Sequence, residues 1–235
     1  IARRVRFLRE IGVDYLLAVV PDKHTIYPEH VPPQLQPLSD VSPLDALLAA
    51  LPPEIRAHVL DLRPALLEAR KQQQVYWRTD SHWNRLGAWV GGKGIVAALR
   101  NDPPGSASRA LPETRAEGVM AGDLARMIGV RRGFEEPEVM LVAAPGTQRC
   151  AHDAAGGRPA YGAPQQTLFC ESAQFGTVAV YHDSMGIELL FALADHFTKS
   201  RWVSSRTWNL AELAQLKPAL VIDEVVERNL PLLAD

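Results

Sequence analysis

The stretch "GTVAVYHDSMGIELLFALADHF", Gly176 to Phe197, decides the fold. Its first part is a short apolar run rich in Val, which is typical of a strand buried on both faces of a sheet. Its second part carries Ile and Leu in a helical pattern. A strand that leads directly into a helix is the repeating unit of an α/β sheet, so this stretch predicts that architecture.

The same alternation of strand and helix recurs along the chain. Strands are predicted at "DYLLAVVP", "AHVLDL" and "SRWVSS", and at "ALVIDEVVERNL", which runs into a terminal helix. Helices are predicted over 2–10, 44–51, 64–73 and 85–100, in "AGDLARMIGV" after an Asp cap, and in "LAELAQL". The glycines of the helix over 85–100 predict close packing against the sheet. We therefore expect one domain over residues 1–235, a three-layer α/β/α sandwich with a mostly parallel sheet.

Residues from about 131 to 175 are the least regular part of the chain. "EVMLVAAP" and "QQTLFC" are strand candidates around a polar loop, so we expect a small β-rich insertion there. Cys150 and Cys170 flank a Gly-, Ala- and Pro-rich segment of this region. A disulfide between them would suit an oxidising compartment, whereas two buried thiols would suit a reducing one. Two cysteines alone do not decide between these alternatives.

Composition excludes several classes of protein. A chain of 235 residues can bury the core of one α/β domain. The formal net charge of −2 provides no broad basic field, so we expect no nucleic-acid partner. No apolar run is long enough to span a bilayer. The helical pattern begins at Ile1 without a signal peptide, which indicates an excised portion whose targeting segment is missing.

Ser184 is the most informative polar residue, because it lies where a buried strand turns into a helix. In such a sheet, functional groups gather at the carboxyl ends of the strands. Free amide N–H groups at the start of the helix would surround a tetrahedral oxyanion formed on the Ser184 hydroxyl. The alternative is that Asp183 and Ser184 only cap the helix. Ser184 is therefore a candidate nucleophile.

A candidate base lies in "VYWRTDSHWN", Val75 to Asn84. In an extended segment, residues two apart project to the same side, so Asp80 can accept the proton of one ring nitrogen of His82. The other nitrogen would then face Ser184, which completes a nucleophile, base and orienting acid. The alternative is a histidine held by a local turn, with Trp77 and Trp83 as core anchors.

A metal site is the third interpretation of these residues. Asp80 and His82 could ligate zinc together with His24, His30 or His182. The chain has neither a His-x-x-x-His nor a Cys-pair spacing. We therefore predict no metal.

Several blocks of the chain resemble one family. "RTDSHWNRLGA" is similar to the Asp-x-His-Trp-Asn block of the SGNH-hydrolase-like alginate O-acetyltransferases, the AlgJ/AlgX group. "VAVYHDSMGIELLFALADHF" resembles their Asp-Ser nucleophile block, and "VVPDKHTIYPEHVP", "AGDLARMIGV" and "KPALVIDEVVERNL" resemble further stretches of that group. The matches run from about residue 12 to 230 in consistent order. The Asp/His pair precedes the serine by about a hundred residues, the reordered arrangement of this group, whereas ordinary SGNH esterases place the serine early.

The resemblance implies an SGNH-like sheet and a Ser184–His82–Asp80 triad that forms an acetyl-serine intermediate without a cofactor. It implies a polysaccharide hydroxyl as acceptor, in the periplasm, with an acetyl donor supplied by a membrane-bound O-acyltransferase. That setting favours a Cys150–Cys170 disulfide. The sequence departs from the family at His182, where Gly or Arg is usual, and at Met185, where an aromatic is common. We interpret His182 as structural.

The remaining site residues are weaker candidates. We consider Arg206, Asn209 and Tyr27 for the oxyanion hole, against the alternative that each is an ordinary loop or surface residue. Trp77, Trp83 and Trp208 could stack on sugar rings, although large aromatic side chains more often pack in cores. Asp22 and Lys23 are expected to form a local pair at the same rim.

Two other functions share these features. A carbohydrate acetylesterase would use the same steps up to the acyl-enzyme, with water in place of the acceptor sugar. A non-catalytic polysaccharide-binding subunit of an export complex would need neither nucleophile nor base. The joint presence of Ser184, His82 and Asp80 argues against that second alternative.

Overall fold

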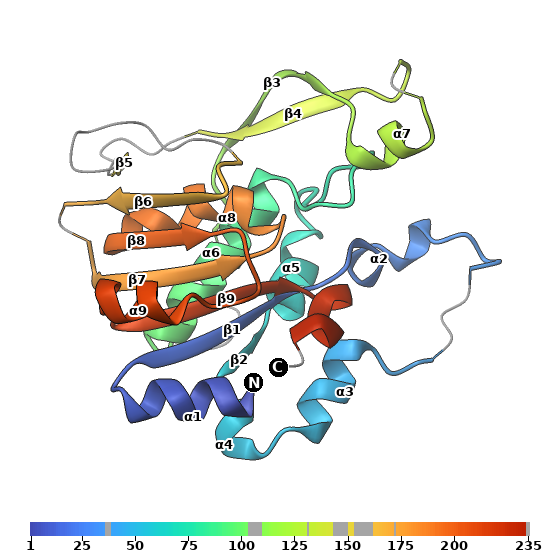
Figure 1. Ribbon diagram of the computed structural model, residues 1–235. Helices are drawn as coiled ribbons and strands as arrows, with labels where there is room; N and C mark the ends of the chain where they lie inside the picture. Colours follow the sequence, from blue (N-terminus) through green and yellow to red (C-terminus); the bar gives the residue numbers. More distant parts are fainter. Residues whose placement is uncertain are drawn as a thin grey trace.

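A computed structural model describes residues 1–35, 39–102, 110–130, 132–142, 150–152, 162–171 and 173–233. A seven-stranded sheet in the order β2-β1-β9-β7-β8-β6-β5 runs through its middle (Figure 1). The strands are β1 (Asp14–Val20), β2 (Val59–Asp61), β5 (Ala151–His152), β6 (Gln165–Phe169), β7 (Phe175–His182), β8 (Phe197–Val203) and β9 (Leu220–Val226). The neighbouring strands β2, β1, β9, β7 and β8 pair in parallel. Strand β6 pairs with β8 in antiparallel orientation.

Helices cover both faces of the sheet. One face packs against α5 (Arg63–Ala69), α6 (Arg85–Leu99) and α8 (Gly186–Leu193), and the other against α1 (Ala2–Glu10), α3 (Pro43–Ala50) and α9 (Leu210–Leu216). Shorter elements are α2 (Lys23–Ile26), α4 (Pro53–Arg56) and the 3₁₀ segments η1 (Pro28–His30), η3 (Ala194–His196) and η4 (Glu227–Leu233). This arrangement confirms the predicted three-layer α/β fold. Within the described ranges, every helix is too short or too polar to cross a membrane.

Strand β1 shows why the central strands have continuous apolar runs. Leu16, Ala18 and Val20 belong to the core beneath α6 and α8, whereas Leu17 and Val19 belong to the core beneath α1 and α3. Positions 15–20 of this strand are therefore all buried, and the apolar-polar alternation of a half-exposed strand is absent. Burial of each such aliphatic side chain contributes about 1.5–3 kcal/mol.

The glycines of α6 permit two close contacts. A Cβ atom at Gly91 would lie 2.7 Å from Cζ3 of Trp83, and one at Gly92 would lie 3.1 Å from the carbonyl oxygen of Ala192 in α8. The sequence predicted close packing against the sheet. The structure instead places a buried indole and a neighbouring helix against these glycines.

A hairpin stands apart from the main sheet. Strands β3 (Thr114–Met120) and β4 (Glu136–Leu141) pair in antiparallel orientation, and α7 (Asp123–Met127) lies between them in the chain (Figure 1, top). We call residues 114–141 the arm. The predicted insertion at about 131–175 differs from this boundary, because β3 is mostly exposed and carries no apolar alternation. The candidate strand "QQTLFC" belongs to the main sheet, as β6.

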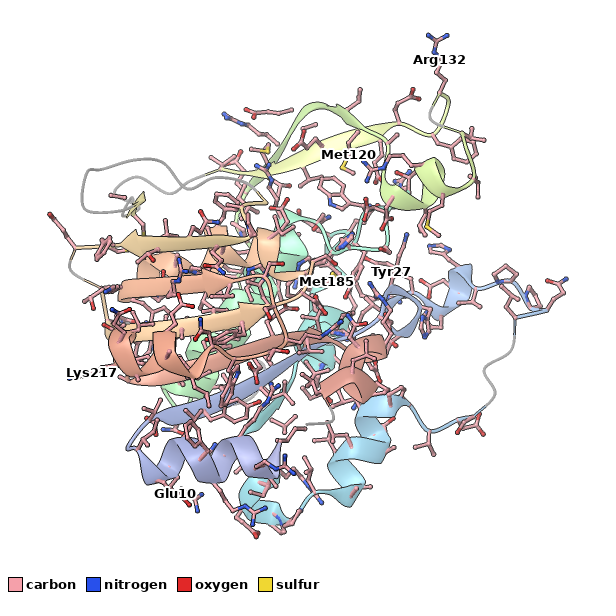
Figure 2. All side chains as sticks on the ribbon, viewed as in Figure 1. Glu10, Tyr27, Met120, Arg132, Met185 and Lys217 are labelled. Atoms are coloured by element: carbon pink, nitrogen blue, oxygen red, sulfur yellow. A yellow bond between two sulfur atoms is a disulfide. The ribbon has the colours of Figure 1, made fainter. Side chains whose placement is uncertain are left out.

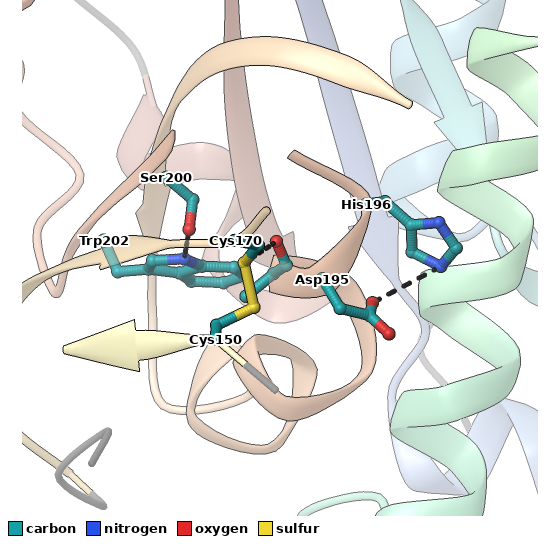
Figure 3. The surroundings of a disulfide bond; sticks show 7 residues. Cys150, Cys170, Asp195, His196, Ser200 and Trp202 are labelled. Carbon is teal, nitrogen blue, oxygen red and sulfur yellow. Dashed lines mark hydrogen bonds and ion pairs between the residues drawn. A yellow bond between two sulfur atoms is a disulfide. The ribbon is translucent and has the colours of Figure 1, made fainter. Parts of the chain in front are cut away.

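A disulfide closes the edge of the main sheet. Cys150 and Cys170 are bonded, which ties the start of β5 to the end of β6 (Figure 3). Of the two alternatives left open by the sequence, the structure contains the bridged form.

Candidate active site

Ser184 lies in the turn between β7 and α8, at the carboxyl edge of the sheet, and its side chain is exposed. The preceding residue, Asp183, fixes this turn. Its Oδ1 accepts a hydrogen bond from the Met185 amide at 3.0 Å, and its Oδ2 accepts from the Val226 amide and from Nδ2 of Asn229, both at 2.9 Å. We call residues 183–186, which carry the candidate nucleophile, the nucleophile turn. These bonds tie it to the end of β9. Figure 2 shows Met185 and Tyr27 at this edge and Lys217 at the opposite end of the sheet.

His182 supports the turn from below. It is 4% exposed, and its Nδ1 lies 2.7 Å from the carbonyl oxygen of Asp183. Burial lowers the pKa of His182, so its ring is neutral. A Cβ atom at Gly186 would lie 2.4 Å from the His182 side chain, so only glycine fits at the first residue of α8. His182 thus has the structural role proposed from the sequence.

The loop that carries His82 is joined to the nucleophile turn by Trp83. We call residues 78–84 the base loop. The Trp83 side chain is fully buried, and its Nε1 donates a hydrogen bond to the Met185 carbonyl at 3.0 Å. The next residue, Asn84, caps α6 by accepting from the Gly87 amide at 2.9 Å. Trp83 therefore links two segments that are far apart in the chain.

Asp80, His82 and Ser184 form one hydrogen-bonded line. The His82 Nε2 lies 2.8 Å from the Ser184 Oγ, and the His82 Nδ1 lies 2.5 Å from Oδ1 of Asp80. The same Asp80 oxygen accepts the His82 amide at 2.9 Å. Because the Asp80 carboxylate accepts a hydrogen bond from Nδ1–H, the ring carries its proton on Nδ1 and Nε2 is left as an acceptor for the serine hydroxyl. The structure thus brings the three predicted residues together.

The charges of this line are set by their surroundings. Burial opposes ionisation of Asp80, which is 7% exposed. Hydrogen bonds from the His82 ring and from the His82 and Asp123 amides outweigh that effect and hold the pKa of Asp80 well below its usual range. The hydrogen bond to Asp80 raises the pKa of His82, and burial opposes the rise. His82 is therefore a stronger base than an isolated imidazole.

Two acidic residues of the arm hold the base loop, and the sequence did not reveal either of them. Glu136, which is 6% exposed, accepts hydrogen bonds from the Arg78 and Thr79 amides and from the Thr79 hydroxyl, all at 2.8 Å. Asp123 accepts from the Ser81 amide at 2.7 Å and from the Ser81 hydroxyl at 2.5 Å. The Asp of "AGDLARMIGV" was predicted to cap its helix, but the residue at the cap position is Gly122.

The oxyanion candidates Arg206 and Asn209 have other roles. Oδ1 of Asn209 accepts from the Glu212 amide and caps α9, and the carbonyl of the exposed Arg206 accepts from Arg4. Trp208 belongs to the same segment, and its Nε1 donates to Asp223 on the face covered by α1 and α9. Asn209 and Trp208 thus have structural contacts in this segment, and the oxyanion roles of Arg206 and Asn209 stay predictions.

Tyr27 is a support for the segment that precedes the base loop. Its hydroxyl accepts the Val75 amide at 3.0 Å, and the Arg70 guanidinium lies 4.8 Å from its ring centroid. This contact with Val75, rather than the oxyanion hole, is its described role. Trp83 cannot stack on a sugar because it is fully buried, and Trp77 is only 5% exposed.

Asp22 and Lys23 do not form the predicted local pair. Oδ1 of Asp22 lies 2.5 Å from Nη1 of Arg228. The Lys23 ammonium donates to the carbonyl oxygens of Arg78 at 2.7 Å and Asp80 at 3.0 Å. Lys23 thus holds the backbone of the base loop, and Asp22 is neutralised by an arginine from the other end of the chain.

A groove of about 1440 Å³ extends from the base loop over α2 and η1. Its lining carries Lys23, Arg78 and Arg228, and Arg228 is paired with the one lining carboxylate, Asp22, so two positive charges are in excess. The aromatic rings of its lining are largely buried, so they offer edges more than open faces. The lining includes Arg78 and Ser81 of the base loop and also Lys23, which donates to two carbonyl oxygens of that loop. The excess positive charge of this lining favours an anionic ligand.

From the sequence, Asp80 and His82 are predicted to hold no metal. Ligand atoms of Asp80, His82 and Asp123 lie within 4.8 Å of one another, a spacing that a cation could use. Hydrogen bonds from the His82 ring, the Ser81 hydroxyl and two backbone amides already account for the positions of these atoms. We therefore describe the cluster as a hydrogen-bonded base.

Beneath the nucleophile turn lies a buried acid that has no hydrogen-bond partner among the described residues, Glu224 of β9. It is fully buried, and it pairs in register with His182. Burial raises the pKa of Glu224 well above its ordinary value, and the nearby Asp183 carboxylate adds to the rise. Burial therefore favours the protonated, neutral form of Glu224 in the folded protein.

Glu224→Gln is expected to stabilise the protein increasingly as pH rises. The unfolded chain releases the Glu224 proton above about pH 4.3, whereas the folded chain keeps it, so the wild type loses stability between the unfolded and folded pKa values. Glutamine has no proton to release. The difference in melting temperature between variant and wild type should thus grow from about pH 5 to pH 8.

The neighbouring Asp223→Asn is the matched control for Glu224→Gln. Asp223 is also buried, but it is paired with Arg4, Tyr15 and Trp208. Removing its charge should destabilise the protein by about 3–5 kcal/mol. Equal destabilisation by both substitutions would contradict the assignment of Glu224 as a neutral acid.

Comparison with known proteins places these observations among relatives. Residues 1–187 match the family described as "SGNH hydrolase-like domain, acetyltransferase AlgX". A protein of Pseudomonas syringae pv. tomato named "Probable alginate O-acetylase AlgJ" is 35% identical over 104 residues, which cover 41% of this chain and 25% of that protein. Its namesake in Pseudomonas aeruginosa is 37% identical over 97 residues, covering 40% and 24%. The match therefore spans about a quarter of the length of these relatives.

Solved structures share the fold at low sequence identity. Bacillus cereus PatB1 superposes with a TM-score of 0.69 at 16% identity, covering 97% of this chain and 87% of that one. The O-acetyltransferase domain of Pseudomonas putida AlgJ gives a TM-score of 0.55 at 20% identity, covering 100% and 82%.

Proposed function

The chain belongs to the SGNH hydrolase-like acetyltransferase AlgX family, and from this membership we propose that it transfers acetyl groups to hydroxyls of an exopolysaccharide. The observation that carries the proposal is the unbroken hydrogen-bonded line from Asp80 through His82 to Ser184, next to a groove that Ser81 of the same loop lines. A nucleophile, a base and an orienting acid in this order are what acyl transfer through a serine requires.

The first half-reaction acetylates the enzyme. His82 takes the hydroxyl proton on Nε2 while Ser184 Oγ attacks the carbonyl carbon of an acetyl ester or thioester. The imidazolium is held by Asp80, and it then protonates the leaving group, so that acetyl-Ser184 remains. The Met185 amide donates to the Asp183 carboxylate and the Gly186 amide donates to the Asp183 carbonyl. The Ser184 amide is therefore the donor of this turn for the oxyanion, and each such donor contributes about 3 kcal/mol.

The second half-reaction delivers the acetyl group to the polymer. His82 removes the proton from a sugar hydroxyl, whose oxygen attacks the acetyl carbon and displaces Ser184 Oγ, which recovers its proton from His82. The groove presents Lys23, Arg78 and Arg228 beside this position, so an acidic polysaccharide would be attracted to it. The relatives are named for alginate, and we propose a polymer of that class as the acceptor.

The acetyl donor and the compartment belong to the same proposal. We propose that a membrane-bound O-acyltransferase supplies the acetyl group and that the domain works in the periplasm. The Cys150–Cys170 disulfide supports an oxidising compartment.

The proposal is tested with a chromogenic acetyl ester, offered with and without alginate oligosaccharides. The expected result is acetylated oligosaccharide, detected by mass spectrometry, together with faster release of the chromophore when the acceptor is present. Release of acetate alone, with no acetyl group on any oligosaccharide, would overturn the transferase and leave an acetylesterase.

Ester turnover should fall as the pH is lowered through the pKa of His82. Only the neutral ring can accept the proton of Ser184, and the hydrogen bond to Asp80 raises its pKa above 6.5. The acidic limb of the kcat/KM profile is therefore expected at a higher pH than that of an isolated imidazole. A profile that stays flat down to about pH 5 would contradict His82 as the base.

A further inference from the structure

We propose that Asp123 is a positioning residue of this site, a second carboxylate that acts on Ser184 through His82. The inference rests on the proposed function, because it assigns a role within the same reaction. Asp80 lies on one side of the His82 Nδ1, at 2.5 Å, and Oδ2 of Asp123 lies on another side, at 3.6 Å. The base therefore faces two acidic groups.

Hydrogen bonds fix Asp123 in this place. Its two carboxylate oxygens accept hydrogen bonds from the amide and from the hydroxyl of Ser81, at 2.7 and 2.5 Å. Its own amide donates to Oδ2 of Asp80 at 2.8 Å. Asp80, Ser81 and Asp123 are thus joined in one hydrogen-bonded ring. Ser81 is the residue directly before His82. The Asp123 carboxylate can turn away from the imidazole only by breaking its two bonds to Ser81, and the Asp80 carboxylate only by breaking its bonds to His82 and to the Asp123 amide.

The chain around Asp123 is built for close approach to the base loop. A Cβ atom at Gly122 would lie 2.4 Å from both Cβ of Asp80 and the carbonyl oxygen of Thr79. The Gly122 amide donates to the Thr79 hydroxyl at 3.0 Å, and the Ala125 amide donates to the Thr79 carbonyl. Glycine at this position is therefore what allows Asp123 to come within reach of His82.

The effect on the reaction follows from charge. His82 becomes positive each time it takes the proton of Ser184, and a second negative charge at 3.6 Å stabilises that state. The Asp123 side chain is 27% exposed, so solvent screens part of its charge, and its effect should be smaller than that of Asp80. We expect the loss of its charge to lower kcat roughly tenfold and to leave KM unchanged.

The experiment uses Asp123→Asn, which keeps an acceptor for Ser81 and removes the charge. The His82 ring is titrated by NMR with labelled histidine, and its signal is identified by its absence in His82→Gln. The expected result is a lower pKa of His82 in the variant and an acidic limb of kcat/KM that moves to lower pH. Loss of turnover without any change in the His82 titration would mean a structural role and would overturn the proposal.

Two further variants keep the test decisive. Asp195→Asn is the matched control, because Asp195 also lies 3.6 Å from a histidine nitrogen, that of His196, far along the sheet (Figure 3). It should leave the His82 titration and the rate unchanged. If Asp123→Asn does not fold, Asp123→Ser also removes the charge and should lower the pKa of His82. An unchanged titration in that folded variant would equally overturn the proposal.

The two levels of inference fail separately. If the wild type turns over no acetyl ester, the proposed function is wrong, but the His82 titration still decides whether Asp123 acts on the imidazole. If ester turnover is normal and the titration does not respond to Asp123→Asn, the function stands and the role of Asp123 is wrong.

Discussion

Ser184→Ala is expected to lower the turnover of an acetyl ester by about four orders of magnitude or more. The Ser184 hydroxyl is the group that His82 Nε2 contacts, at 2.8 Å, and alanine offers no atom to carry the acetyl group. The fold should survive, because the side chain is exposed and the turn is held by Asp183. Steady-state assays with a chromogenic ester measure the loss of turnover. The melting temperature shows whether the variant keeps its fold.

Ser204→Ala is the matched control. Ser204 is also exposed and follows the neighbouring strand β8, but its described hydrogen bond is made by its backbone amide, to the Pro164 carbonyl. Its substitution should leave turnover unchanged.

Peptide mapping of the wild type after brief exposure to the ester should show one acetyl group on the peptide that contains Ser184. Turnover by Ser184→Ala within tenfold of the wild type would mean that another nucleophile operates.

The fold was predictable because its signals are local. Each central strand, such as β1, is buried on both faces and therefore appears as a continuous apolar run. The spacing of Asp80 and His82 was also a local signal, but the predicted extended segment was wrong, because residues 78–82 form bends and Asp80 reaches the ring across a local turn. The structure realises both interpretations of that stretch. Asp80 accepts the His82 amide in a local turn, Trp83 anchors the core, and the same turn orients the ring toward Ser184.

The rest of the site depends on contacts between residues far apart in the chain. Asp123 looked like a helix cap because an Asp before an apolar helical run usually is one. Its partner Ser81 lies 42 residues away, and the sequence carries no sign of that contact. Arg206 and Asn209 follow a strand at the expected edge, and their oxyanion roles stay predictions. The side-chain oxygen of Asn209 caps α9, and the backbone carbonyl of Arg206 accepts from Arg4.

Asp80→Asn is the second substitution with a large expected effect, a loss of about 10⁴ in kcat. The Asp80 carboxylate accepts the Nδ1 proton of His82 at 2.5 Å and thereby leaves Nε2 free for Ser184. Asparagine would point its side-chain N–H₂ either at the imidazole or at the backbone amides of His82 and Asp123, which now donate to the Asp80 oxygens. With the N–H₂ toward the ring, the proton of His82 moves to Nε2, and the base can no longer take the serine proton. Ester assays from about pH 5 to pH 9 measure this loss.

The comparison of Asp80→Asn with Asp123→Asn separates tautomer control from charge. Both substitutions remove one negative charge beside the same imidazole, so a purely electrostatic role would make their effects differ only in proportion to distance, 2.5 against 3.6 Å. Only Asp80 accepts the ring proton directly. We therefore expect a gap of about a thousandfold between the two variants in kcat, at every pH above the acidic limb. Equal losses of kcat would mean that neither carboxylate fixes the tautomer of His82. Both would then act only through the electrostatic effect of their charges on the imidazole.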